Sequence, residues 1–529
     1  MFSNEQYNSF LGREITMDKK RNSSGLLANA PAIAFISFVG IVYIIGMFTN
    51  KPWYDELYTY YFFIDRGPVY AAIHWPVPNN HVGYSVVSAL LNFLGNPYVS
   101  LRGISVLAGI ANLMLIYRLC LNFMDEYFSM AAMALYSGAF LVLRLAIQGR
   151  GYTLATTCLL LAASAVYRIA IGDCRTRNYV LFAFALCFGL YIVPSSLYWV
   201  IPVCVTGGLY LLLKKRFPDL IKLILSGVIA AVMTFFLYLV IWLAIGANLL
   251  CKDAGSAYYG LSQVNVILKA PFLSAKTGMD YMLATPYIQS IDRVECLKKM
   301  PEYFVSLFGQ FYDKAGILLF VLAFVIMIGC VTITIRRMKR GGNAFLSFFI
   351  SCVMIMVPII LMIQSVHPYL RVLSFYAVFM AIGAVYCLYT MVQALTDANG
   401  IDYAVMILSM LISAICLLSP YYRSPLADRE NDIAAVLAKM DDPQSIDQIF
   451  YLDDFQKYVI KFYYDAKPTE VYSLEEAMYV IAGPEFSDTS YGDPQWPVLY
   501  GYSSEMLEYV QEHMEPVAEA EGYTVYRRD

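Results

Sequence analysis

Long apolar blocks alternate with short polar connections along most of the chain. The blocks cover residues 28–48, 103–121, 127–146, 152–171, 179–193, 196–213, 220–247, 315–335, 344–363, 372–393 and 403–420. A helix of about 20 apolar residues is long enough to cross the hydrocarbon core of a bilayer. We therefore expect a polytopic α-helical membrane protein with about eleven transmembrane helices.

Basic residues occur in every second connection between these blocks. They are Arg13, Lys19, Lys20, Arg21, Arg118, Arg168, Arg175, Arg177, Lys214, Lys215, Arg216, Lys222, Arg336, Arg337, Lys339 and Arg340. The positive-inside rule puts such connections in the cytoplasm. Residues 1–27 are then a cytoplasmic N-terminus, and the segment after the last block is extracytoplasmic. The first block is longer than the apolar region of a cleaved signal peptide, so we interpret it as a permanent helix.

One apolar segment, His81–Gly95, does not fit this alternation, and it is only 15 residues long. In a helix, one face would carry its polar side chains, His81, Ser85, Ser88 and Asn92. The apolar side chains would lie mostly opposite, which is typical of a helix lying in the membrane interface. We therefore predict one outer loop over 49–101 that contains interfacial helices. A second large outer loop is expected over 248–314.

The composition of the chain changes sharply after residue 420. Acidic residues become frequent, and short apolar runs such as Ile446–Leu452 and Tyr479–Ala482 alternate with helix-like stretches. This alternation predicts a small extracytoplasmic α/β domain over 421–529, whose last strand includes Tyr523–Tyr526. The transmembrane domain would then cover 28–420.

The overall composition supports the membrane assignment. Hydrophobic residues make up 59% of the chain and charged residues only 15%, whereas soluble domains carry about 25% charged residues. No clustered basic face is visible, so we expect no nucleic-acid partner. Two cysteines, Cys251 and Cys296, share the second outer loop. Their pattern allows either a disulfide, in an oxidising compartment, or two free thiols.

Two adjacent carboxylates, Asp55 and Glu56, follow the first apolar block. A solvated helix end is the ordinary interpretation of such a pair. The neighbouring aromatic residues are Tyr54, Tyr58, Tyr60, Tyr61, Phe62 and Phe63. Aromatic side chains of this kind favour the headgroup level of a membrane, where partial desolvation would raise the proton affinity of a carboxylate. A carboxylate in that setting can act as a general base toward an alcohol.

The segment from His74 to Tyr84 brings together two histidines, two asparagines and two prolines. Asn80 could simply cap a helix, but the polar stripe that starts at His81 favours a binding surface. A zinc site is the weaker alternative, because His74 and His81 are seven residues apart across two prolines and no metal-ligand spacing repeats.

Several arginines lie at the predicted outer ends of the spans, namely Arg102, Arg144, Arg150 and Arg371. Snorkelling to the headgroups is the ordinary interpretation. Arg150 has Tyr152 beside it, and Arg371 has Tyr369, in two short turns. A guanidinium fork matches phosphate oxygens, so these two turns could clamp a lipid phosphate. Lys269, in the second outer loop, is a weaker candidate for the same role.

These features resemble the GT-C glycosyltransferases, in the branch of the protein O-mannosyltransferases and the bacterial lipid A aminoarabinose transferase. The resemblance is carried by the acidic pair, the turn Pro78-Asn79-Asn80-His81, the run Leu101–Ser105 and the triplet Arg150-Gly151-Tyr152. It covers the layout of about the first 390 residues. The acidic C-terminal domain is not explained by it.

The resemblance implies a sugar donor on polyprenyl or dolichyl phosphate, and inverting transfer to an acceptor hydroxyl on the extracytoplasmic face. Asp55 would be the general base, oriented by Glu56. The residues expected at the donor phosphate are Arg150, Tyr152, Arg371, Tyr369 and Lys269. The residues expected at the acceptor are Tyr58, Asn80, His81 and Arg102. Family members often show an Arg-Tyr pair entering a late span, whereas Tyr369 here precedes Arg371, which puts the role of Arg371 in question.

A monophosphate donor does not require a metal, so we expect no metal and no other cofactor. The expected partners are the lipid-linked donor, the bilayer and an acceptor that is a glycan, a lipid or a protein. The expected location is the plasma membrane of a bacterium. A transporter or flippase of lipid-linked saccharides is the main alternative, although transporters tend to carry internal repeats and charges near the bilayer midplane. A non-catalytic envelope protein is a third interpretation.

Overall fold

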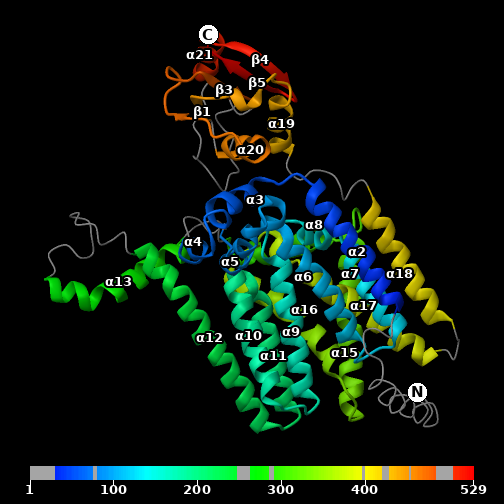
Figure 1. Ribbon diagram of the computed structural model, residues 1–529. Coiled ribbons are helices and arrows are strands. Elements are labelled where there is room, and N and C mark those ends of the chain that lie inside the picture. Colours follow the sequence, from blue (N-terminus) through cyan, green and yellow to red (C-terminus); the bar gives the residue numbers. More distant parts are fainter. Residues whose placement is uncertain are drawn as a thin grey trace.

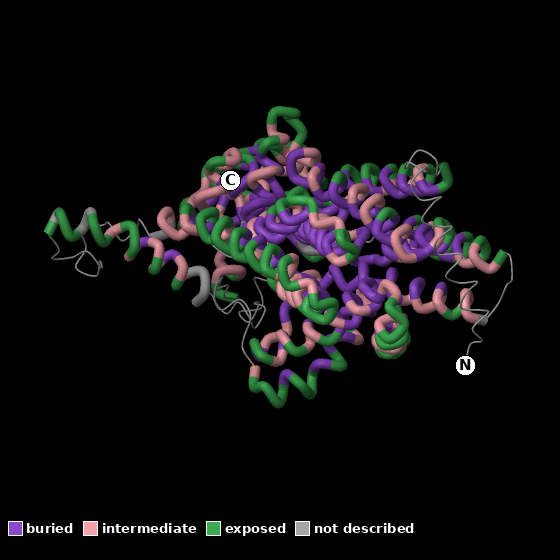
Figure 2. Tube along the Cα trace, turned by 90° about the horizontal axis from the view of Figure 1, so that it is seen from below, coloured by how far each residue is buried: buried purple, intermediate pink, exposed green. Residues whose placement is uncertain are grey.

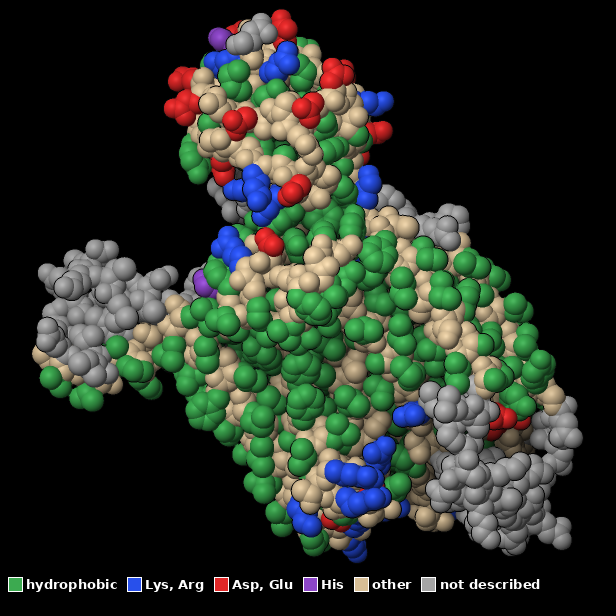
Figure 3. All heavy atoms as spheres, in the orientation of Figure 1, with side chains coloured by type: hydrophobic (Ala, Val, Ile, Leu, Met, Phe, Trp, Pro, Cys, Tyr) green, Lys and Arg blue, Asp and Glu red, His purple; other side chains and the backbone are tan. Residues whose placement is uncertain are grey.

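The structure is a computed structural model that describes residues 30–74, 80–246, 262–284, 291–395, 400–419, 428–451, 454–483 and 504–528. Long helices form a bundle, and the C-terminal residues form a small domain at one end of it (Figure 1). The side of the bundle seen in Figure 3 is rich in hydrophobic side chains and carries almost no charged ones between its two ends. This surface suits a lipid environment.

Nine helices in the described part of the chain are long and apolar enough to cross a membrane. They are α2 (Ala30–Thr49), α6 (Pro97–Cys120), α9 (Tyr152–Ala170), α11 (Leu197–Leu213) together with η4 (Pro194–Ser196), α12 (Phe217–Gly246), α15 (Gly316–Lys339), α16 (Phe345–Gln364), α17 (Tyr376–Leu395) and α18 (Ile401–Leu418). The predicted polytopic helical membrane fold is therefore confirmed.

The other two predicted spans are less regular, so the count of eleven stays a prediction. One is α10 (Thr176–Ile192), which has 17 residues. The other is divided into α7 (Glu126–Gly138) and α8 (Phe140–Ile147), which are bent by 70° relative to each other.

The break between α7 and α8 is filled by another part of the protein. The backbone amide of Phe140 donates to the carbonyl of Phe311 (2.7 Å), and that of Leu141 donates to Gln310 (2.9 Å). These carbonyls directly follow α14 (Arg293–Gly309). Because an unpaired amide is costly in hydrocarbon, these two hydrogen bonds explain how a membrane helix can be interrupted here.

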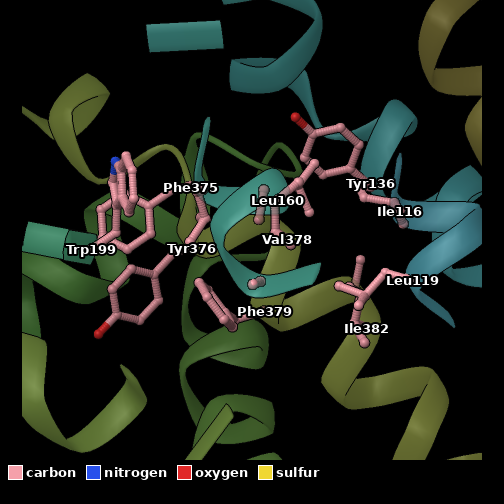
Figure 4. Packing of buried hydrophobic residues seen from close by; sticks show 14 of the residues in the cluster. Ile116, Leu119, Tyr136, Leu160, Trp199, Phe375, Tyr376, Val378, Phe379 and Ile382 are labelled. Atoms are coloured by element: carbon pink, nitrogen blue, oxygen red, sulfur yellow. The ribbon is translucent and has the colours of Figure 1, made fainter. Parts of the chain in front are cut away.

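The apolar core lies in the middle of the bundle, and the exposed residues are on its outer helices (Figure 2). In Figure 4, Trp199 of α11 lies beside Phe375 and Tyr376 at the start of α17, and Phe379 follows one turn later. Gly189 lies directly against the Trp199 ring, where a Cβ atom would come within 2.5 Å of it. A glycine is therefore needed for α10 and α11 to approach this closely.

Short helices cover the end of the bundle next to the C-terminal domain. They are α3 (Tyr54–Thr59), the π-helical turn η2 (Tyr60–Ile64), α4 (Pro68–Ile73), α5 (Val82–Ala89) and η3 (Leu90–Leu94). In the predicted interfacial segment, Ser85 and Ser88 are buried, whereas Leu90 and Phe93 are exposed. The polar face thus packs inward and the apolar face points outward, as expected of a helix at a lipid surface.

The C-terminal domain consists of α19 (Asp428–Leu437), η8 (Pro443–Ser445), β1 (Ile449–Phe450), α20 (Asp454–Tyr464), β2 (Glu470–Val471), β3 (Tyr479–Ala482), α21 (Ser504–His513), β4 (Glu515–Ala520) and β5 (Tyr523–Arg527). Its sheet has the order β2-β1-β3-β5-β4. Strand β1 is parallel to β2 and β3, and the remaining pairs are antiparallel. The predicted small α/β domain is present, and its last strand is β5.

The two ends of the bundle differ in charge. Figure 3 shows lysines and arginines gathered at the end opposite the C-terminal domain. Helix α15 reaches that end with Arg336, Arg337 and Lys339 in its last turn. This polarity is the one that the positive-inside rule requires if the C-terminal domain is extracytoplasmic, and that orientation stays a prediction.

Candidate active site

Glu56 lies in a buried ion pair with Arg102. The Nε and Nη2 atoms of Arg102 are 2.7 and 2.9 Å from the two carboxylate oxygens of Glu56, and both side chains are only 1% exposed. The geometry is the bidentate one that a guanidinium fork favours. The pair therefore fixes α3 against α6.

The same pair also holds two other segments. The amide of Gly149 donates to Glu56 Oε1 (2.7 Å), and Arg102 Nη1 donates to the carbonyls of Met47 (2.8 Å) and Asn50 (2.6 Å) at the end of α2. The turn that carries Arg150 is thereby attached to α3. Glu56 and Arg102 form a structural brace between four parts of the chain.

Asp55, the neighbouring residue, lies in a more open position. Its Oδ2 atom is 3.2 Å from Nη2 of Arg371 and 3.9 Å from Nη2 of Arg150, and its side chain is 21% exposed. Arg150 is buried and also donates to Thr59 Oγ1 (2.9 Å). A partly accessible carboxylate is thus placed between two guanidinium groups that come from distant parts of the chain.

His81 completes the group on the buried side. Its Nδ1 accepts a hydrogen bond from the Gly151 amide (2.9 Å), and its Nε2 is 3.2 Å from Nη2 of Arg150. Burial, together with the charges of Arg150 and Arg371, lowers the pKa of His81 well below its usual value. The ring is therefore neutral. Since Nδ1 accepts from the Gly151 amide, the proton of the neutral ring belongs on Nε2, next to Arg150.

Arg371 lies in η6 (Leu370–Leu373), at the entrance to α17. Its guanidinium stacks on the Tyr369 ring (4.6 Å to the centroid) and lies 5.3 Å from the Trp53 ring centroid. Its Nε atom is buried and has no hydrogen-bond partner among the described residues. Since an unsatisfied buried N–H of a charged group is costly, this atom marks a place where an anion would be stabilised.

A small pocket lies next to this group. Its lining is formed by Tyr152, Ala155, Thr156, Val193, Ser195, Ser196, Trp199, Val372, Ser374 and Phe375. Several of these residues carry a hydroxyl group, and three are aromatic. Trp199 and Phe375 are the ring pair seen in Figure 4.

The predicted site residues do not all meet. Asp55, His81, Arg150 and Arg371 come together, with Tyr152 edge-on to the His81 ring (4.8 Å) and Tyr369 stacked on Arg371. Lys269 is exposed on α13 (Gln263–Ala284), which extends away from the bundle in Figure 1. The structure does not bring it to Asp55.

Three predicted acceptor residues are engaged elsewhere. Arg102 belongs to the brace described above. Asn80 donates to the carbonyls of Ala71 (3.1 Å) and His74 (2.8 Å), and accepts from the Ser85 hydroxyl (2.8 Å). The N-cap of α5 is His81, not Asn80. The Tyr58 ring stacks on Phe62 at 4.6 Å, within the contact with the C-terminal domain. Arg102 and Asn80 are thus hydrogen-bonded within the protein, and the Tyr58 ring is packed inside it.

The site also contains groups that sequence reasoning missed. Thr59 binds Arg150, and it lies four residues after Asp55, which is one turn along the same helix face. The backbone amides of Gly149 and Gly151 also take part, and a pattern of side chains cannot reveal them.

Residues 75–79 and Cys251 lie outside the described residues. Cys296 is a buried free thiol, 3.4 Å from His367 Nε2. The described part of the chain has no cluster of three metal ligands.

No protein-family model matches the sequence, and no curated protein matches it. Among solved structures, the chain is similar to the oligosaccharyltransferase of Archaeoglobus fulgidus with Zn and sulfate (TM-score 0.49, 12% identity, 85% of this chain and 68% of that one). It is similar to ArnT of Cupriavidus metallidurans bound to undecaprenyl phosphate (0.41, 11%, 94% and 98%). It is also similar to arabinosyltransferase EmbB of Mycobacterium smegmatis (0.38, 12%, 74% and 38%).

At identities of 11–12% no residue-by-residue correspondence is drawn, so the role of each side chain has to come from the geometry of this chain.

Proposed function

We propose that this protein is a membrane glycosyltransferase that moves a sugar from a polyprenyl-phosphate donor to an acceptor hydroxyl. The observation that supports this proposal most is the setting of Asp55. Its partly exposed carboxylate lies 3.2 Å from Arg371, whose buried Nε has no partner among the described residues. Transfer from a phosphate to a hydroxyl needs such a combination, a base for the incoming oxygen and cations for the leaving group.

In the proposed reaction, Asp55 accepts the proton of the acceptor hydroxyl. The acceptor oxygen then forms a bond to the anomeric carbon while the bond from that carbon to the phosphate oxygen breaks. The electron pair of the broken bond leaves with the phosphate. Because the acceptor oxygen attacks from the face opposite the phosphate, the configuration of the anomeric carbon inverts. Arg371 can serve both partners, because Nη2 faces Asp55 while Nε has no hydrogen-bond partner among the described residues. Arg150 and the Nε2–H of His81 would stabilise the remaining phosphate charge.

The proposal includes a membrane orientation. Residues 49–101 and the C-terminal domain would be extracytoplasmic, the N-terminus would be cytoplasmic, and the donor would reach Arg371 from the outer leaflet. ArnT, which is similar in overall layout, was solved with undecaprenyl phosphate. The proposed donor is therefore a sugar on a bacterial polyprenyl phosphate, and the acceptor is a hydroxyl of a glycan, a lipid or a protein.

A flippase of lipid-linked saccharides is the second candidate, because interrupted helices such as α7 and α8 occur in transporters at substrate sites. In this protein the amides exposed by the break, those of Phe140 and Leu141, donate to Phe311 and Gln310. The break is thus closed by the protein's own carbonyls, which favours the transferase.

The test is a mass-spectrometric comparison of envelope glycans and polyprenyl-phosphate sugars in cells with the gene, without it, and with Asp55→Asn. Asp173→Asn is the matched control, since Asp173 is also paired with an arginine, Arg175, but in the connection between α9 and α10. We expect gene loss and Asp55→Asn to remove the same sugar decoration while one lipid-linked sugar accumulates. If Asp55→Asn behaves like the wild type while gene loss has an effect, the proposal is wrong and the flippase leads.

A further inference from the structure

The C-terminal domain contacts the start of the helix that carries Asp55. The backbone amide of Tyr54 donates to Oε1 of Glu430 at 2.6 Å, although the two residues are 376 positions apart in the chain. Glu430 is on α19 and is 5% exposed. A buried carboxylate of one domain is therefore bonded to the backbone directly before Asp55 in the other.

This bond falls where a helix most needs an acceptor. The first amides of a helix have no carbonyl partner inside it, and a carboxylate at that end also interacts favourably with the helix dipole. Tyr54 is the first residue of α3, and the Glu56 side chain accepts from the preceding amide, that of Trp53 (3.4 Å). Glu430 thus supplies the second carboxylate that holds the start of α3.

The other end of the same segment is also held by the C-terminal domain. The Tyr458 ring of α20 stacks on Tyr61 at 5.5 Å. Lys461 Nζ lies 3.9 Å from the centroid of that Tyr61 ring and 3.8 Å from Oδ2 of Asp65. These contacts join α20 to η2, which continues directly from α3.

We propose that docking of the C-terminal domain positions Asp55, with Glu430 capping α3 and Lys461 and Tyr458 holding η2. Glu430 is then a positioning residue that acts through the backbone of Tyr54. The catalytic importance of this docking rests on the proposed function, because Asp55 is the group that the docking aligns with Arg371 and Arg150. The contact itself is independent of that function and can be measured separately.

The experiment uses the full chain in lipid nanodiscs and compares the wild type with Glu430→Gln and Glu430→Ala. Hydrogen–deuterium exchange is followed in peptides that cover residues 53–65 and, as a folding control, in β3 and β5. We expect faster exchange over 53–65 in both variants, with β3 and β5 unchanged. Glu430→Gln should be affected less, because its amide oxygen can still accept from Tyr54.

Sugar transfer is measured on the same samples. Loss of a helix cap and of alignment should lower kcat by about tenfold in Glu430→Ala, whereas the KM for the donor should change little because the arginines remain. A purely structural defect would reduce the amount of active protein and leave the exchange of 53–65 unchanged in the folded fraction. Partial retention of kcat in Glu430→Gln is expected from positioning through the hydrogen bond.

A second, milder pair of variants covers the case in which Glu430→Ala unfolds the domain. Lys461→Met removes the contact with Asp65 and Tyr61. Lys457→Met is the matched control, since Lys457 is on the same helix but pairs with Glu470 inside the domain (2.6 Å). We expect faster exchange over 53–65 only in Lys461→Met, with a decrease of kcat of about twofold.

The outcomes separate the two proposals. Unchanged exchange over 53–65 in Glu430→Ala and Lys461→Met would overturn the positioning role, whatever the enzyme does. If the wild type transfers no sugar from any donor, the proposed function fails, while the exchange data still decide whether the domain holds α3. Faster exchange with an unchanged kcat would show a contact that does not position Asp55, and it would also overturn this inference.

Discussion

Asp55 and Glu56 are adjacent in the chain and both face arginines, but their surroundings differ. Both oxygens of Glu56 are bonded to Arg102, one of them also accepts from Gly149, and the side chain is almost completely buried. Asp55 has one oxygen near Arg371 and keeps contact with solvent. One ion pair is complete within the protein, whereas the other has room for a ligand.

This difference distinguishes the structural ion pair of Glu56 from the candidate active site at Asp55. A buried, fully bonded pair holds its segments in place, and removing one partner is costly because the other charge is left without compensation. A half-open pair can exchange partners at little cost. Since successive residues of a helix point about 100° apart, only one of two adjacent carboxylates can face the interior of the bundle, and the other is left for chemistry.

The largest expected effect is on turnover in Asp55→Asn. Loss of a general base typically lowers a rate by about 10²- to 10⁴-fold, while the partly exposed position of Asp55 predicts an almost unchanged melting temperature. The measurement is the release of polyprenyl phosphate from the donor by the purified variant, next to a thermal unfolding curve. If Asp55→Asn lowers the melting temperature and loses activity in proportion, Asp55 has a structural role like that of Glu56, and the difference between the two carboxylates does not exist.

The next effect is on stability in Arg102→Ala, which leaves Glu56 buried without its partner. We expect a loss of about 3–5 kcal/mol in the free energy of unfolding, seen as poor recovery and a lowered melting temperature. Arg175→Ala is the control, because that arginine pairs with Asp173 at the surface and its loss should leave the melting temperature unchanged. If Arg102→Ala melts like the wild type, the brace is not structural.

A smaller effect is expected from Arg371→Lys. The lysine keeps the charge but loses the planar fork that can face Asp55 and a phosphate at once. We expect kcat/KM for the donor to fall by about tenfold, with no change in the melting temperature. Arg144→Lys provides the comparison. Arg144 lies on α8, near the same end of the bundle as Arg371, but its guanidinium contacts the Phe140 ring. Equal losses in both variants would mean that Arg371 has no special role.

Much of the architecture could be predicted from the sequence, because apolar length and charge asymmetry act locally. The membrane helices, the inward polar face of the segment after His81 and the C-terminal α/β domain all follow from such patterns. The broken span did not, because its cause is a contact of Phe140 with Phe311, far away in the chain. Similarly, the apolar pattern does not indicate that α13 extends away from the bundle with Lys269.

The candidate site was predictable only in part. Side-chain type and membrane side were enough to single out Asp55, His81, Arg150 and Arg371, which lie together in the structure. The division of labour between Asp55 and Glu56 was not predictable, because it depends on where Arg102 of another helix reaches. The same holds for Tyr58, whose place against the C-terminal domain is set by Tyr458.

The smallest expected effect concerns the pH dependence of stability through His81. Burial and the charges of Arg150 and Arg371 keep its pKa in the folded protein well below the unfolded value, which is about 6.5. The unfolded chain therefore takes up a proton as the pH falls below about 6.5, while the folded protein does not. The stability that comes from the neutral ring is fully present above that pH and is lost as the pH falls toward the folded pKa, by up to about 1.4 kcal/mol per pH unit.

His81→Asn isolates this contribution, because an Asn oxygen can accept from the Gly151 amide in place of Nδ1 but does not titrate. The measurement is the unfolding free energy of both proteins between pH 7.5 and pH 5. We expect their difference to be constant above about pH 6.5 and to shift in favour of the variant below it. Other titrating groups, including His367, cancel in this difference. A constant difference over the whole range would mean that His81 takes up its proton equally in both states, so that the two arginines and burial do not hold it neutral.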